Sequence, residues 1–241
     1  VNELSNRLHA DHLPVLMAMS KDRYSEANAA YDEPTFYRIA REAVNALEGY
    51  GELSYEHGRQ LIDLARATED RTLRRIALTT AASLCEAEIR QQIWAIVKNK
   101  DLLSWARADA TEALALAPFV EADILSKITP KRLMRVSATL AASLTALVGR
   151  HFPVGEAAAF LEQIGKSQTH RALLLLGVYA LESRDRAVAM GLLDLLDDGH
   201  PARKLLDDDG TLLPSNVLDD LGDVRIRKRV GEWLKDRIEE N

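Results

Sequence analysis

The sequence contains a single cysteine, Cys85, among its 241 residues. One cysteine excludes a disulfide within the chain and leaves no cysteine cluster for a metal ion. Because Cys85 directly follows the apolar run 81–84, we expect a small buried side chain rather than a reactive thiol.

Signals of β-strands and of the common catalytic motifs are also missing. No run alternates between apolar and polar residues, and no Gly-rich phosphate loop, G-x-S-x-G elbow, H-E-x-x-H or dinucleotide fingerprint occurs. His9 and His12 lie three residues apart but lack a third ligand nearby, and the acidic run 207–210 does not continue as a calcium-binding loop. The sequence therefore predicts no metal site and no cofactor.

Aromatic residues are scarce, at 5% of the chain, whereas hydrophobic residues make up 47% and charged residues 28%. The apolar volume comes mainly from Ala, Leu, Val and Ile, of which Ala and Leu are strong helix formers. The formal net charge is -6, whereas dedicated nucleic-acid binders are usually basic. A nucleic-acid partner is therefore disfavoured, although a local basic face remains compatible with this charge.

Long hydrophobic runs are absent. The longest apolar stretches, 136–148 and 172–181, are shorter than the roughly 20 residues that cross a bilayer. The first residues lack the charged start and apolar core of a signal peptide. We expect a cytoplasmic protein without a membrane partner.

A recurring helix-opening pattern is the most informative feature that is present. A carboxylate precedes a basic, apolar stretch at Asp70-Arg71, at Asp185-Arg186 and at Asp223-Val224-Arg225. The first two copies are 115 residues apart, about three units of roughly 38, and the last two are 38 apart. Spacings of this size are typical of stacked helix pairs.

Helical periodicity predicts about ten to twelve helices. Ser54 is expected to open one helix, with His57 at the capping-box position, and Thr129-Pro130 to open another that runs to Val148. Residues 54–84 form the clearest helix pair. The other predicted helices cover 3–12, 34–47, 89–97, 101–117, 119–127, 153–164, 169–182, 185–196, 217–221 and 224–238, with a long loop at 197–215.

The pattern Asp70-x-x-Leu73-Arg74-x-x-Ala77 resembles the turn and second helix of a HEAT repeat, as does Asp223-Val224-Arg225. The resemblance covers about a third of the chain. It implies an all-α fold, an irregular HEAT-like stack of antiparallel helix pairs (an α-solenoid), with residues 1–241 as one domain. It also implies a protein-interaction or scaffold module that binds a partner along a groove between successive second helices.

Three basic clusters are candidate partner-binding sites. On one concave face they would hold an acidic protein segment or a polyanion. Alternatively, they form solvated faces and ion pairs between repeats, which the interspersed carboxylates favour. The clusters are Arg71, Arg74 and Arg75; Lys127, Lys131, Arg132 and Arg135; and Arg225, Arg227, Lys228 and Arg229.

Trp105 and Asp109 are four residues apart and share one face of a predicted helix. A tryptophan beside a carboxylate is similar to the site of HEAT-like alkylpurine DNA glycosylases. That resemblance implies base excision, with Trp105 contacting a cationic damaged base and Asp109 stabilising the developing charge. Under a purely structural interpretation, Trp105 is a core residue and Asp109 is a surface residue. Base excision is therefore the enzymatic alternative to an interaction module.

Overall fold

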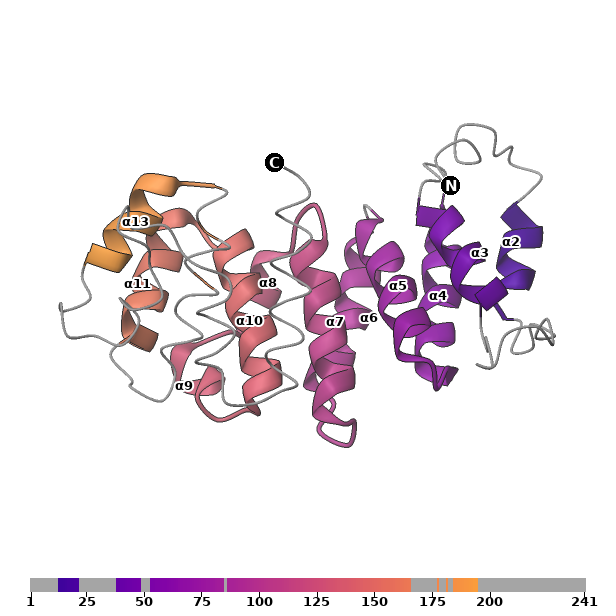
Figure 1. Cartoon of the computed structure of the whole chain (residues 1–241), viewed down its shortest axis with the longest axis horizontal. Coiled ribbons are helices and arrows are strands. Elements are labelled where there is room, and N and C mark those ends of the chain that lie inside the picture. The colour runs from indigo at the N-terminus through magenta and orange to yellow at the C-terminus, as the bar shows by residue number, and fades with distance from the viewer. Residues whose placement is uncertain are drawn as a thin grey trace, which may run out of the picture. The chain divides into compact units, whose positions relative to one another are not determined.

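The computed structural model describes residues 13–21, 38–48, 53–84, 86–165, 177, 181 and 184–194. These residues form helices and loops, and they contain no strand (Figure 1). The all-α prediction is therefore confirmed for this part of the chain. The predicted helices 3–12, 169–182, 217–221 and 224–238, the loop 197–215, Cys85 and the histidines at 9 and 12 lie outside the described residues or largely so.

The chain divides into two compact units, which are described separately. One unit comprises Val1–Leu102 with Asp109–Val120, and the other comprises Leu103–Ala108 with Glu121–Asn241. Helix α7 (Ser104–Leu116) contributes its first five residues to the second unit and the remainder to the first.

Helices α4 (Tyr55–Ala67) and α5 (Arg71–Ser83) form the centre of the first unit and pack against each other. The other helices of this unit are α2 (Leu13–Met19), α3 (Arg38–Glu48) and α6 (Ala87–Lys98). Helix α5 also contacts α3 and α6, α2 contacts α3, and α4 contacts α6. The buried side chains are mainly Leu, Ile and Ala, with Trp94 the largest.

The starts of these helices agree with the capping signals of the sequence. Ser54 precedes α4, and its backbone N–H donates to His57 Nδ1 at 3.0 Å. Asp70 precedes α5, and its carboxylate accepts the backbone N–H of Leu73 at 2.6 Å. Each cap satisfies a donor that the first turn of a helix leaves without a partner.

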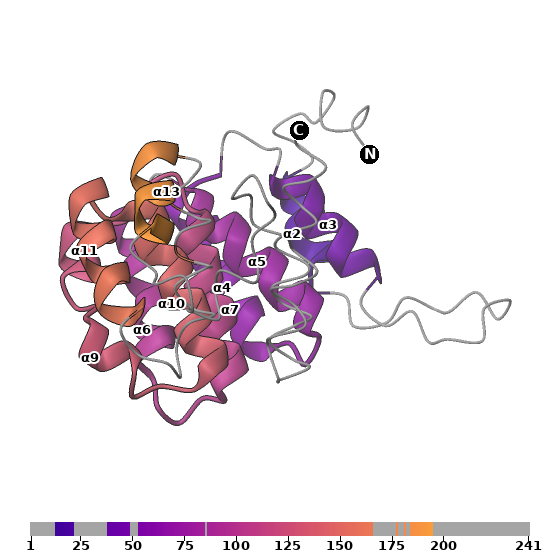
Figure 2. The same ribbon diagram turned by 60° about the vertical axis from the view of Figure 1, so that its left-hand side comes forward.

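The second unit contains α8 (Ala122–Leu125), α9 (Pro130–Leu133), α10 (Ala138–His151), α11 (Val154–Gly165) and α13 (Arg186–Asp194). Helix α11 packs against α10 and α13, as Figure 2 shows, and α9 contacts α10 and α11. The rings of Phe152 and Phe160 meet edge to face, with centroids 5.8 Å apart. As predicted, Asp185 opens α13, and its carboxylate accepts the N–H of Val188 at 3.1 Å.

The prediction of one helix from Thr129 to Val148 is wrong. The structure has a short α9 and then a separate α10, because Ser137 is extended and its hydroxyl accepts the N–H of Leu140. Helix α10 also continues through Gly149 to His151 and ends before Pro153, whose ring disfavours a helical conformation of the preceding residue. Two other predicted helices are shorter than expected, since α7 begins at Ser104 and α8 covers only Ala122–Leu125.

Gly58 lies where α4 closely approaches α6 and the residue that follows α5. A Cβ at this position would be 2.8 Å from Ile89 Cδ1 and 2.8 Å from Leu84 Cδ1, which is closer than carbon atoms pack. By contrast, a Cβ at Gly155 on α11 would meet no atom within 4 Å.

We predict opposite effects of alanine at these two glycines. Gly58→Ala should lower the free energy of unfolding by about 1 kcal/mol, because overpacking outweighs the gain in helix propensity. Gly155→Ala should raise it by a few tenths up to about 1 kcal/mol. Urea denaturation followed by circular dichroism measures both, and a stabilising Gly58→Ala would show that α4 has more room than the structure gives it.

Candidate interaction site

Two ion pairs connect α5 to α7 within the first unit. Arg71 Nη2 lies 3.6 Å from Asp109 Oδ1, and Arg75 Nη2 donates to Glu112 Oε1 at 2.6 Å. The paired residues are 38 and 37 positions apart in the sequence. The later arginine on α5 pairs with the later carboxylate on α7. The two helices therefore lie side by side and run in the same direction.

The same spacing occurs between α4 and α6. Gln92 Nε2 donates to the hydroxyl of Tyr55 at 3.1 Å, and these residues are also 37 positions apart. Two separate sets of helices in the first unit are thus related by a shift of 37 or 38 residues.

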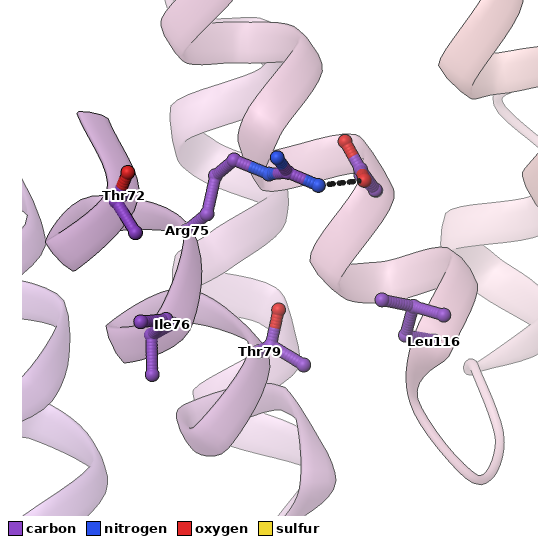
Figure 3. A pocket seen from close by; sticks show the side chains of 6 residues that line it. Thr72, Arg75, Ile76, Thr79 and Leu116 are labelled. Atoms are coloured by element: carbon purple, nitrogen blue, oxygen red, sulfur yellow. Dashed lines mark hydrogen bonds and ion pairs between the residues drawn. The ribbon is translucent and has the colours of Figure 1, made fainter. Parts of the chain in front are cut away.

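A pocket of about 270 Å³ lies between α5 and α7. Figure 3 shows Thr72, Ile76 and Thr79 along one face of α5, Leu116 on α7, and the side chain of Arg75 directed toward its carboxylate partner. The pocket is smaller than the roughly 300–1,000 Å³ typical of small-molecule sites. The volume of the pocket suits one or two inserted side chains. Its lining is largely aliphatic and hydroxyl-bearing.

The two ion pairs at this pocket are exposed unequally. The side chain of Arg71 is 46% exposed and that of Arg75 is 32% exposed, whereas Asp109 and Glu112 are 0% and 7% exposed. The arginine side chains consequently reach the surface, whereas the carboxylates are covered. The two ion pairs are electrically balanced, and their exposed members are the arginines.

Exposed apolar side chains continue from the pocket past the end of α7. Leu116, which lines the pocket, is 42% exposed, and Phe119 is 45% exposed, with exposed Pro118 between them. The ring of Phe119 covers the buried guanidinium of Arg90, whose Cζ lies 3.8 Å from the ring centroid. A cation–π contact of this kind holds the aromatic ring in place although much of it faces solvent.

Arg74, the middle residue of the first basic cluster, is buried. Its Nε donates to the carbonyl of Ala65 at 3.2 Å, and its Nη2 donates to the carbonyl of Thr68 at 2.6 Å. Burial lowers the pKa of Arg74, against the opposing effect of the Asp109 and Asp70 charges. The structure therefore divides the predicted cluster: Arg71 and Arg75 reach the surface, and Arg74 secures the turn between α4 and α5.

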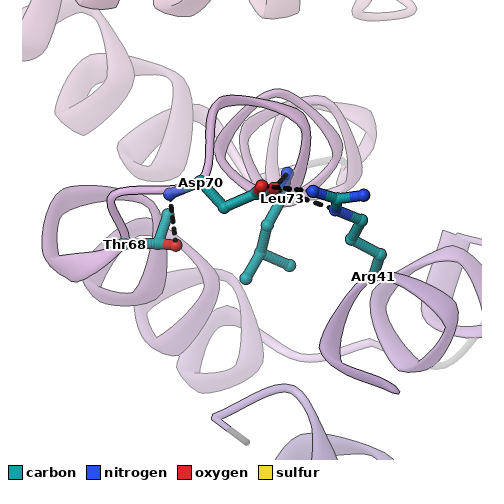
Figure 4. A network of polar contacts seen from close by, with 4 residues as sticks. All are labelled: Arg41, Thr68, Asp70 and Leu73. Carbon is teal, nitrogen blue, oxygen red and sulfur yellow. Dashed lines mark hydrogen bonds and ion pairs between the residues drawn. The ribbon is translucent and has the colours of Figure 1, made fainter. Parts of the chain in front are cut away.

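Asp70 holds the start of α5 against α3 (Figure 4). Arg41 Nε donates to Asp70 Oδ1 at 3.0 Å, and a second guanidinium nitrogen of Arg41 contacts Oδ2. Burial raises the pKa of Asp70, but the bonds from Arg41 and Leu73 and the charges of Arg41 and Arg74 outweigh burial and lower it below the ordinary 3.8. The backbone N–H of Asp70 also donates to Thr68 Oγ1 at 3.2 Å.

The second basic cluster lies in the second unit. Lys131 and Arg135 are exposed, Arg132 is half-buried and donates to the carbonyl of Lys127 at 3.1 Å, and Lys127 pairs with Asp123 at 3.2 Å. Burial lowers the pKa of Arg107, as does the nearby charge of Arg132. The third cluster, Arg225, Arg227, Lys228 and Arg229, lies outside the described residues.

Trp105 and Asp109 both lie on α7 as predicted, but their environments differ from those of an open site. Trp105 is half-buried, and the Asp109 side chain is fully buried beneath Arg71. Sequence reasoning missed Arg41, Glu112, Leu116 and Phe119. The recurrence of an arginine and a carboxylate 37 or 38 residues apart is a signal that pointed to Glu112.

Among the described residues, no three His, Cys, Asp or Glu side chains gather closely enough to hold a metal ion. Within the same residues, no helix combines the length and apolar character that spanning a membrane requires. Comparison of the chain with protein-family models, with curated proteins and with solved structures gives no match.

The Asp70–Arg41 contact predicts a pH-dependent stability. Because the pKa of Asp70 is lower in the folded than in the unfolded chain, its contribution is complete at neutral pH and is lost as the pH falls through the folded-state value, below 3.8. Asp70→Asn should therefore lower the free energy of unfolding by roughly 1–2 kcal/mol at neutral pH, with the difference vanishing in acid.

Urea titrations of the wild type and Asp70→Asn across this pH range measure the effect. Asp63→Asn is the matched control, because Asp63 forms a more exposed pair with Arg66 on α4. A difference between wild type and Asp70→Asn that stays constant with pH would contradict the assignment.

Proposed function

We propose that this protein is a non-catalytic interaction module, an irregular HEAT-like stack of antiparallel helix pairs that binds a protein partner along the groove between α5 and α7. The observation that carries the proposal is the pocket between these two helices, with exposed Leu116 and Phe119 continuing from it. Exposed apolar side chains beside a pocket are typical of protein-binding surfaces.

The constant spacing supports the stacked arrangement. Contacts between α5 and α7 and between α4 and α6 join residues 37 or 38 positions apart. Such a relation is expected when α4/α5 and α6/α7 are successive repeats, with the first helices in one layer and the second helices in the other. In that arrangement α5 and α7 are successive second helices, and the HEAT-like resemblance predicts a binding groove between such helices.

The ion pairs support a preformed binding surface. Arg71 and Arg75 link α5 to two positions on α7, one turn apart, and both carboxylates are buried. Separation of the helices would remove these opposite charges from two buried carboxylates, which is costly. A groove held in this way binds its partner with little loss of conformational freedom.

Base excision receives less support. Asp109 would have to approach a flipped nucleotide, but its side chain has no exposure and lies beneath Arg71. The net charge of -6 also opposes binding to DNA.

A photo-crosslinking experiment tests the proposed surface. With p-benzoylphenylalanine in place of Phe119, a 45% exposed aromatic residue close in sequence to the pocket residue Leu116, we expect a discrete crosslinked partner in the cells that make this protein. The control places the same residue at Asp63, an exposed position on α4. Absence of an adduct from position 119, or the same adduct from both positions, would count against a partner at the groove.

A base-release assay tests the alternative. The full chain incubated with duplex DNA carrying 7-methylguanine should release no more base than heat-denatured protein, because Asp109 is covered. The same assay on Trp105→Ala and Asp109→Asn identifies the origin of any activity. Base release that both substitutions abolish would support the glycosylase alternative and remove the basis for a non-catalytic role.

A further inference from the structure

The groove between α5 and α7 also indicates the chemistry of its partner. We propose that it binds a peptide segment in which an aliphatic side chain lies next to a carboxylate. This inference rests on the proposed function, because it assigns a ligand class to the same groove.

The aliphatic part follows from the pocket. Ile76 and Leu116 supply aliphatic carbon, and Thr72 and Thr79 each supply a methyl group beside the hydroxyl. At about 270 Å³ the pocket has room for a Leu, Ile or Met side chain with the backbone at its entrance. The described lining contains no aromatic ring on which a nucleotide base would stack.

The carboxylate part follows from the exposed ends of the ion pairs. Arg75 lines the pocket, and Arg71 lies about 6 Å away, one helical turn along α5. The side chains of Arg71 and Arg75 are 46% and 32% exposed, whereas their own carboxylates, Asp109 and Glu112, are covered. Guanidinium groups form charge-assisted, often bidentate, hydrogen bonds with carboxylates, so an acidic residue of the partner is the complementary group.

The charge balance selects a short acidic peptide over a polyanion. The positive charges of Arg71 and Arg75 are offset by those of Asp109 and Glu112, and exposed Glu69 lies just before α5. A face without net positive charge gives nucleic acid little electrostatic attraction. A single carboxylate of the partner, hydrogen-bonded to Arg71 or Arg75 beside the aliphatic pocket, matches this charge balance.

Selection from a random-peptide phage library on the full chain tests this chemistry. The enriched peptides should carry Leu, Ile or Met within two residues of Asp or Glu, and synthetic fluorescein-labelled copies should bind with an affinity measurable by fluorescence anisotropy. Enrichment of basic peptides, of apolar peptides without an acidic residue, or of no peptide would overturn the proposal.

Two variants locate the binding. Thr79→Trp fills the pocket, and the pair Arg75→Gln with Glu112→Gln removes the guanidinium without leaving a buried carboxylate unpaired. Each should weaken the binding of the selected peptide by about tenfold or more. The matched controls are Ala95→Trp at an exposed position on α6, and Arg59→Gln with Glu56→Gln, an exposed ion pair on α4.

The controls should bind the peptide like the wild type, and thermal unfolding by circular dichroism verifies that all four variants fold. Equal loss in the test and control variants would place the peptide elsewhere and overturn the proposal. Should the crosslinker at position 119 capture a partner while selection yields other chemistry, the ligand class alone fails. Failure of both experiments would remove the interaction site as well.

Discussion

Buried carboxylates on α7 are the constraint on which the first unit depends. Removing a charge from water costs several kcal/mol unless opposite charge and hydrogen bonds compensate it. Asp109 and Glu112 receive part of this compensation from Arg71 and Arg75, and the charge of Asp109 also acts on buried Arg74. The two ion pairs therefore hold α5 against α7 beside the pocket.

The same constraint changes what the arginines would contribute to the proposed binding. In the sequence, Arg71, Arg74 and Arg75 look like a basic cluster that would attract a polyanion. In the structure Arg74 donates to backbone carbonyls. The charges of Arg71 and Arg75 are offset by the buried carboxylates that pair with them. What remains at the surface is directional hydrogen bonding rather than long-range attraction. Such a surface recognises a partner by close fit and contributes little to steering over distance.

Local signals in the sequence predicted the helix starts well. Ser54, Asp70, Thr129 and Asp185 each precede a helix, because a short polar side chain satisfies the backbone donors of the first turn wherever the helix packs. Ser137 carries the same signal, but the continuous apolar run after Val136 concealed it, and one long helix was predicted where two exist. Capping preferences locate a boundary only when the flanking pattern changes with it.

Packing partners were harder to predict, and α7 shows why. Small alanines lie on more than one side of this helix, and every residue from Ala108 to Ala115 is buried, so the sequence does not show which side of α7 meets α5. The burial of Asp109 consequently cannot be predicted unless its pairing with Arg71, 38 residues earlier, is known. Resemblance to a glycosylase site rested on Trp105 and Asp109 alone, two residues of one helix.

Asp70 and Asp109 illustrate what the spacing of repeats does and does not specify. They are 39 residues apart, close to one unit, yet Asp70 caps α5 while Asp109 lies inside α7. Each nevertheless pairs with an arginine from another helix of the first unit. Asp70 pairs with Arg41 of α3, and Asp109 pairs with Arg71 of α5. The ion pair between helices recurs while the local cap does not. In the proposed stack, register is therefore carried by contacts between repeats, and the caps are free to vary.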